Sequence, residues 1–189
     1  MATVTGLMTA EEFAQLPDPR GGERMELVRG AIVMAPPGNA GHGHRARKVE
    51  RTIEDFVIRH NLGLTSGEGG YRLSKNPDTV RAPDGAWISW SSLKAHSFPE
   101  DDYPDAAPNL AIEIVSANDR DVDVAQKVRD FLDAGTDRVW VVRSKQRTVT
   151  VHRPNGDSHT YSPADTLTSE DAGFPVDGFE LRVASIFET

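Results

Sequence analysis

Apolar and polar positions along the chain form patterns that predict both strands and helices. The clearest is residues 110–115 (LAIEIV), an apolar, β-branched run interrupted only by Glu113, which is typical of a strand buried on both faces. Strand alternation places Glu113 on one face with Ala111 and Val115. An ionised carboxylate there costs several kcal/mol unless it is paired or binds a cation. The simpler alternative is a carboxylate at a strand end, exposed or bonded to a neighbour.

Two longer segments have the apolar spacing of helices. One runs from about His44 to His60 and the other from about Val122 to Ala134. Asn118 or Asp119 is a suitable cap for the second helix. The apolar faces are expected to consist of Ala46, Val49, Ile53, Phe56 and Val57 in the first helix and of Val124, Val128, Phe131 and Leu132 in the second.

Shorter patterns complete the prediction of an α/β fold, a mixed central β-sheet flanked by helices. Residues 8–16 suit a short helix, with Thr9 and Glu12 as a capping box. Residues 36–43, 91–108 and 162–177 are expected to be loops. Strands are expected at residues 25–28, 31–34, 86–90, 138–143, 148–152 and 157–161, with one more inside residues 64–73, and the last of these add an extra β-hairpin near the C-terminus.

Length, composition and charge limit the classes of protein to which the chain can belong. A chain of 189 residues suggests a single domain over residues 1–189. No run of apolar residues suits a membrane span and no signal peptide is evident. Since the chain has no cysteine, disulfides and thiolate metal sites are excluded, and a cytoplasmic location is expected. The net charge of −8 argues against strong nonspecific binding to a polyanion but leaves room for a local basic surface.

Two acids and a lysine stand out as candidate chemistry. Asp84 follows Pro83, which suits the first residue of a strand, although a turn aspartate is equally common there. Lys127 borders the apolar face of its predicted helix; alternatively it lays its stem on the core and keeps its amine in water. Together with Glu113, these residues can hold Mg²⁺ or a similar hard cation through oxygen ligands, activate a water and stabilise charge on a phosphate.

The order Pro83-Asp84, Glu113 and Lys127 resembles the PD-(D/E)xK nuclease pattern, and most closely the Uma2 family of restriction-endonuclease-like proteins. The strict pattern would have lysine at Val115, and the helix residue Lys127 replaces it. Where the family often carries Asp-Gly-Glu after its early Glu-Leu-Ile, this chain has Arg29-Gly30-Ala31 and so lacks both acids. The other segments that resemble the family are residues 9–13, 25–30, 111–116, 127–135, 139–142 and 178–187.

The resemblance implies a restriction-endonuclease-like core and a metal-dependent endonuclease that hydrolyses phosphodiester bonds, with DNA as the expected substrate. Asp84 and Glu113 would bind Mg²⁺ or Mn²⁺, Lys127 would assist the attacking water, and Glu26 would add or orient a ligand. Alternatively, Glu26 is a solvent-facing strand residue. A homodimer is compatible with this function, because cutting both strands of a duplex needs two sites.

Two other functions remain open at this point. One is a catalytically silent nuclease-fold protein that acts in nucleic-acid binding or in a structural role, which the missing acids near Gly30 would favour. The other is an enzyme that acts on a small phosphate ester and would need a closed pocket of nucleotide size. The sequence has no glycine-rich phosphate loop, which argues against nucleotide-driven chemistry.

The first half of the long helix contains the densest basic cluster, which suits contact with a phosphate backbone; its members are Arg45, Arg47, Lys48 and Arg51. The alternative is a solvated helix surface balanced by Glu50, Glu54 and Asp55. Just before it, His42 and His44 suggest a metal pair, although in a glycine-rich loop such residues are more often simply polar. The Uma2 family tends to carry a histidine here, and either of the two can correspond to it.

Overall fold

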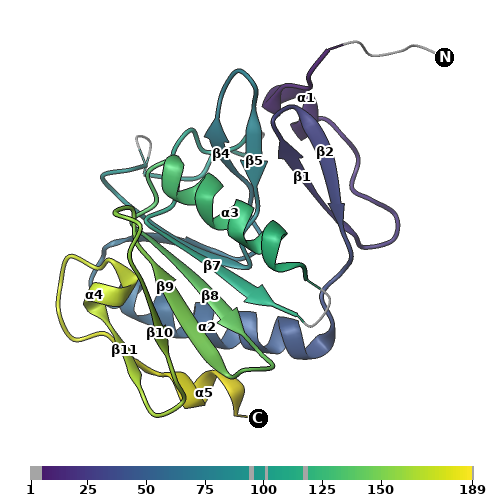
Figure 1. Cartoon of the computed structure of the whole chain (residues 1–189). Helices are drawn as coiled ribbons and strands as arrows, with labels where there is room; N and C mark the ends of the chain where they lie inside the picture. Colours follow the sequence, from purple (N-terminus) through teal and green to yellow (C-terminus); the bar gives the residue numbers. More distant parts are fainter. Residues whose placement is uncertain (1–5, 94–95, 101, 117–118, 189) are drawn as a thin grey trace.

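The structure is a computed structural model, and it describes residues 6–93, 96–100, 102–116 and 119–188. Its fold is centred on a six-stranded mixed sheet (Figure 1). The strand order is β10-β9-β8-β7-β6-β3, and only β7 and β8 are parallel among these pairs. These strands are β3 (Gly63–Ser66), β6 (Gly85–Ser89), β7 (Leu110–Val115), β8 (Arg138–Arg143), β9 (Thr148–His152) and β10 (Ser158–Tyr161). The expected mixed sheet is therefore confirmed.

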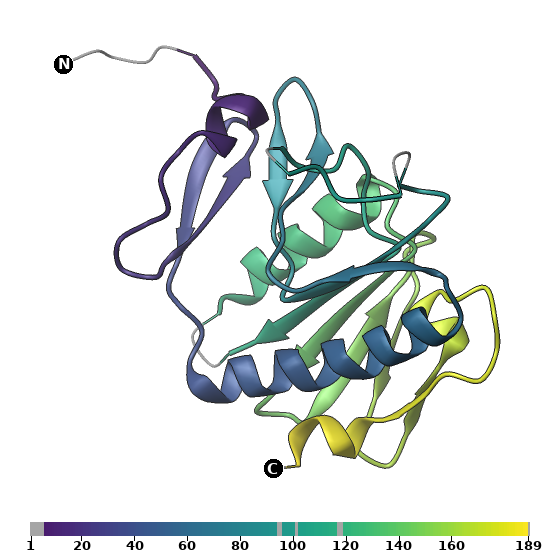
Figure 2. The same cartoon turned by 180° about the vertical axis from the view of Figure 1, so that it is seen from behind.

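Two helices cover the two faces of this sheet. Helix α2 (Ala40–Arg59) packs on one face and α3 (Asp121–Asp133) on the other (Figures 1 and 2). All six residues of β7 are buried, and their alternation is as predicted. Ile112 and Ile114 belong to the apolar cluster that contains α2, whereas Ala111 and Val115 belong to the cluster that contains α3. Glu113 therefore shares the α3 face of the sheet with these two residues.

A second, four-stranded sheet has the order β2-β1-β5-β4. Helix α1 (Ala10–Ala14) packs on one face, where Ala10 and Phe13 contact Leu27 and Val80. The predicted capping box of Thr9 and Glu12 is present at the start of α1. The strands are β1 (Arg24–Val28), β2 (Ala31–Ala35), β4 (Tyr71–Ser74) and β5 (Thr79–Arg81).

The two sheets are joined by a very short connection. Strand β5 ends at Arg81 in the four-stranded sheet, and β6 begins at Gly85 in the six-stranded sheet. Residues 82–84 therefore lie where one sheet gives way to the other. Asp84, the last residue of this connection, is at the junction.

The C-terminal segment closes the α2 side of the molecule (Figure 2). Residues 162–177 are not simply a loop as predicted, since they contain β11 (Thr166–Thr168) and α4 (Ser169–Ala172). Strand β12 (Glu180–Arg182) pairs with β11, and α5 (Val183–Phe187) follows. Leu167, Phe179 and Ile186 bury their side chains in the α2 cluster, so packing defines elements that are too short to show a period.

Several element boundaries also differ from the prediction. Helix α2 begins at Ala40, within the expected loop, because the Asn39 side chain caps it by accepting from the N–H of His42. Residues 64–73 contribute to two strands, β3 and β4, and β5 was not predicted. Helix α3 is preceded by Arg120, without a side-chain cap. Asp119 instead accepts from the N–H of Ser116, and Asn118 lies outside the described residues. Within the described ranges, no helix is long and apolar enough to cross a membrane.

Candidate active site

Asp84 is fixed against β7 by its backbone and its side chain. Its N–H donates to the carbonyl of Ile112 at 2.9 Å, and its Oδ2 accepts from the N–H of Ile114 at 2.7 Å. Gly85 is paired with Ile112 in the antiparallel register of β6 and β7, and Asp84, just before it, bonds to the two residues that flank Glu113. Both side chains are buried. The structure therefore brings the two predicted acids together.

Glu113 is buried in the middle of the α3 face of the sheet, and its environment favours the protonated form. Burial, together with the charges of Asp84 and Glu26, raises the pKa of Glu113 to about 7, even though Lys127 acts in the opposite direction. Its Oε2 atom is 3.1 Å from Lys127 Nζ. Its Oε1 atom is buried and has no hydrogen-bond partner among the described residues.

Lys127 contacts one acidic side chain from each sheet. Its Nζ atom lies 3.1 Å from Oε2 of Glu113, in the six-stranded sheet, and 3.1 Å from Oε1 of Glu26, in the four-stranded sheet. Burial opposes its charge, but the two carboxylates outweigh burial and raise the pKa of Lys127. The lysine is therefore a cation, and its amine lies between two acids rather than in water. Glu26 is buried, so the alternative of a solvent-facing strand residue is wrong.

A second cation, Arg81, holds Glu26 from the other side. Its guanidinium donates to Oε2 of Glu26 at 2.7 Å and to Oδ2 of Asp130 at 2.6 and 2.9 Å. Oε1 of Glu26 also accepts from the N–H of Ala82 at 3.1 Å. These contacts fix the Glu26 carboxylate beside the sheet junction. Arg81 and Asp130 are not among the site residues that the sequence predicts.

Two further basic side chains contact Asp84. Oδ1 is 2.6 Å from the guanidinium of Arg24, and Oδ2 is 3.2 Å from Nε2 of His42. Burial alone would raise the pKa of Asp84, but His42 and Arg24 together lower it, and the hydrogen bond to Asp84 raises the pKa of His42. His42 is thus a buried helix residue at the site and not a polar loop residue, whereas His44 is exposed. The signal available in the sequence was the histidine that the family tends to carry here.

The carboxylates of the site alternate with cations, so each anionic side chain has a cationic partner. In the part of the chain that the structure describes, no group of three or more His, Cys, Asp or Glu side chains is arranged to hold a metal ion. The carboxylate pair of Asp84 and Glu113 and the unpartnered Oε1 of Glu113 are the features that suit a hard cation.

The predicted basic cluster on α2 divides into two parts. Arg47 and Arg51 are exposed and four residues apart, so they share one face of the helix. Lys48 instead donates to the carbonyl of Glu188 at 2.8 Å, and Arg45 is half-buried. The cluster begins about one turn after His42, so α2 carries both a residue of the site and the exposed arginines.

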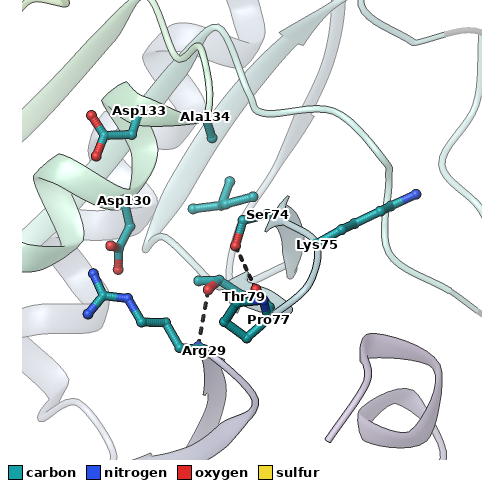
Figure 3. A pocket seen from close by; sticks show the side chains of 9 residues that line it. Arg29, Ser74, Lys75, Pro77, Thr79, Asp130, Asp133 and Ala134 are labelled. Atoms are coloured by element: carbon teal, nitrogen blue, oxygen red, sulfur yellow. Dashed lines mark hydrogen bonds between the residues drawn. The ribbon is translucent and has the colours of Figure 1, made fainter. Parts of the chain in front are cut away.

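A surface pocket of about 240 Å³ lies beside the site and is separate from it (Figure 3). It reaches the site only through Asp130, and Asp84, Glu113 and Lys127 do not line it. Positive and negative side chains are mixed in its wall, with Arg29 and Lys75 alongside Asp130 and Asp133. The pocket is therefore neither the reaction centre nor a closed nucleotide-sized cavity around it.

The comparisons with known proteins agree with this fold. The family model of Uma2, described as "Putative restriction endonuclease", matches residues 10–184, so the chain belongs to the Uma2 family. Among solved structures, it is similar to "a putative nuclease belonging to DUF820" from Anabaena variabilis ATCC 29413, with a TM-score of 0.76 and 21% sequence identity over 95% of this chain and 97% of that chain. That likeness supports the nuclease-like fold. No curated protein matches.

Proposed function

We propose that this protein is a metal-dependent endonuclease that hydrolyses phosphodiester bonds in DNA. The observation that carries the proposal is the cluster at the junction of two sheets, where Lys127 contacts Glu26 and Glu113 and Asp84 is bound to the residue next to Glu113. Glu26 comes from β1, Glu113 from β7 and Asp84 from the connection before β6, and burying them together has a cost in stability. A fold alone does not define an activity. Membership of the Uma2 family, described as "Putative restriction endonuclease", adds independent support for a nuclease.

The donor set fits Mg²⁺ or Mn²⁺. Asp84, in the connection before β6, and Glu113, in β7, supply carboxylate oxygens, and Oε1 of Glu113 is a buried acceptor without a described partner. Mg²⁺ commonly binds through one or two carboxylates and keeps several of its waters, so two protein ligands are sufficient. When bound, the cation lowers the pKa of a coordinated water and polarises the phosphate.

The remaining groups position and stabilise the reactants. In hydrolysis, a water oxygen forms a bond to phosphorus, one P–O ester bond breaks, and the departing oxygen takes up a proton. The Lys127 ammonium orients the water or stabilises the charge that develops on the phosphate oxygens. Arg81 holds Glu26 against Lys127, and Glu26 thereby fixes the lysine. Arg47 and Arg51 on α2 offer phosphate contacts on the outer surface.

A catalytically silent nuclease-fold protein is the second candidate, and one observation favours it. Both oxygens of Asp84 are already engaged, by Arg24 at 2.6 Å and by His42 at 3.2 Å. An Asp84 side chain that keeps these partners would not bind a cation. The two functions therefore differ in whether a divalent ion replaces Arg24 or His42 at Asp84.

Plasmid cleavage with Mg²⁺ or Mn²⁺ tests the proposal. We expect the wild type to nick DNA and Asp84→Asn, Glu113→Gln and Lys127→Met to lose that activity. Glu54→Gln and Lys145→Met are matched controls at exposed positions and should cleave like the wild type. Activity that survives all three site substitutions would contradict the proposal. If the wild type is inactive, calorimetry with the same ions distinguishes an intact site, whose binding Glu113→Gln abolishes, from a silent fold that binds none.

A further inference from the structure

Strand β2 has an unusual surface for an edge strand. It consists of the five residues Ala31–Ala35 (AIVMA) and lies at the end of the four-stranded sheet. Ile32, Val33 and Met34 are 40%, 43% and 50% exposed. These three consecutive residues alternate in direction, so both faces of the strand are apolar and open to solvent. Figure 1 shows β2 at the outer side of the β1–β2 hairpin, away from the body of the molecule.

The other edges of these two sheets lack an exposed apolar strand of this kind. Strand β3, at one edge of the six-stranded sheet, is buried or half-buried along its length. At the other edge of the six-stranded sheet, β10 reads Ser158–Tyr161 (SHTY) and is largely polar. At the edge of the four-stranded sheet opposite β2, β4 is covered by a loop, since the N–H of Arg72 donates to the carbonyl of Pro104 at 3.2 Å. Covered and polar edges are the usual protection against pairing with another chain. Strand β2 lacks both forms of protection in the part of the chain that the structure describes.

We propose that β2 pairs antiparallel with β2 of a second copy of this chain, around a two-fold axis at Val33. The strand suits this partner because Val33 is its central residue. Val33 would then meet Val33 of the second copy, and Ile32 would meet Met34, so each apolar side chain has an apolar neighbour. The same patch meets itself, as a two-fold dimer requires.

Charge favours a second copy over a nucleic acid at this edge. The strand carries no charged residue, so two copies do not repel each other there, although the whole chain has a net charge of −8. An uncharged strand also offers no contact to a phosphate backbone. The apolar surface continues past the strand. Leu7 is 66% exposed and lies against Gly30 at the β1–β2 turn, where antiparallel pairing would bring it near the exposed Pro36 of the second copy.

The pairing would also arrange the two candidate active sites, a step that rests on the proposed function. Val33 is directly opposite Glu26 in the β1–β2 register, so the two residues are on the same face of the sheet. A two-fold axis normal to the sheet keeps both copies of that face on one side. The two Glu26 residues would be separated by three strand spacings, or about 14 Å. Both sites would then face one duplex and serve its two strands.

Sedimentation of the full chain tests the dimer without reference to activity. We expect the wild type to sediment as a dimer at micromolar concentration and Val33→Lys to sediment as a monomer. Ile58→Lys, at an apolar position on α2 that is 69% exposed, is the matched control and should remain a dimer. Met34→Lys repeats the test on the other face of β2, in case Val33→Lys fails to fold. A monomeric wild type, or folded β2 variants that remain dimers, would overturn the proposal.

Plasmid cleavage by the same variants tests the arrangement of the sites. We expect the wild type to produce linear DNA early in the reaction, whereas monomeric Met34→Lys, changed on the face away from Glu26, accumulates nicked circles first. Equal linearisation by both would overturn the pairing of sites while leaving the dimer intact. If neither protein cleaves DNA, the proposed function and the pairing of sites that rests on it both fail. The sedimentation result still decides whether β2 is a dimer interface.

Discussion

Oδ2 of Asp84 accepts a 2.7 Å hydrogen bond from the backbone N–H of Ile114. The carboxylate thereby takes the place of a backbone carbonyl from a neighbouring strand, just before β6 begins. The N–H that it accepts from belongs to the residue that follows Glu113. Asp84 is consequently a structural residue as well as a candidate metal ligand. Loss of activity after its substitution has to be separated from loss of structure.

Asp84→Ala is expected to lower the free energy of unfolding by about 2–4 kcal/mol, because it leaves the N–H of Ile114 and the Arg24 guanidinium without their buried partner. Asp84→Asn keeps an oxygen for the N–H and should cost less. Urea denaturation of the two variants measures the difference. Equal losses would mean that the hydrogen bond to Ile114 does not contribute to stability.

Lys127→Met is expected to destabilise the fold by about 2–4 kcal/mol, since it leaves Glu26 and Glu113 buried without their shared cation. Adding Glu113→Gln should restore part of this stability, because the Glu113 carboxylate, which has lost Lys127, is then removed. A double-mutant cycle in urea measures the coupling between the two positions. Strictly additive effects would contradict the 3.1 Å ion pair. Lys145→Met, at an exposed position, serves as the control.

The pKa of Glu113, about 7 in the folded protein against an ordinary 4.5, predicts a dependence of stability on pH. Because folding favours the protonated carboxyl, its contribution is fully present below pH 4.5 and is lost as the pH rises through about 7. Glu113→Gln lacks this titration. The variant should therefore gain stability relative to the wild type across that window, by up to about 3 kcal/mol.

Thermal or urea denaturation of both proteins at a series of pH values measures this gain. Glu54→Gln, an exposed substitution, should follow the wild type throughout. A constant difference between wild type and Glu113→Gln from pH 4 to pH 8, roughly the span of both pKa values, would show that Glu113 does not titrate as predicted.

Arg81→Met is expected to lower the free energy of unfolding by about 3–5 kcal/mol, because it removes the buried cation shared by Glu26 and Asp130. Arg81→Lys should recover only part of this loss, since one amine cannot reproduce the forked contact of a guanidinium. Arg129→Met on the exposed side of α3 is the control. If Arg81→Met unfolds like that control, the network does not stabilise the site.

The sequence was most informative where a polar residue interrupts an apolar pattern. Glu113 was identified because every other residue of β7 is apolar, and Lys127 because it borders a helical apolar face. Asp84 needed the family resemblance, since aspartate after proline is common. Arg24, Arg81 and Asp130 carry no comparable signal: Arg24 is 60 residues from Asp84, and Arg81 is 49 from Asp130. These residues become neighbours only because the two sheets pack together in the folded protein.

The attachment of the β1–β2 hairpin links the candidate active site to the edge of the molecule. One face of the hairpin packs on α1 through Leu27, and on the other Arg24 and Glu26 meet Asp84, Arg81 and Lys127. A cation that competes with Arg24 for Asp84 would displace one of these pairs. If β2 joins two copies and displacement of that pair shifts the hairpin, metal affinity and subunit affinity are coupled, and each changes the other by the same factor.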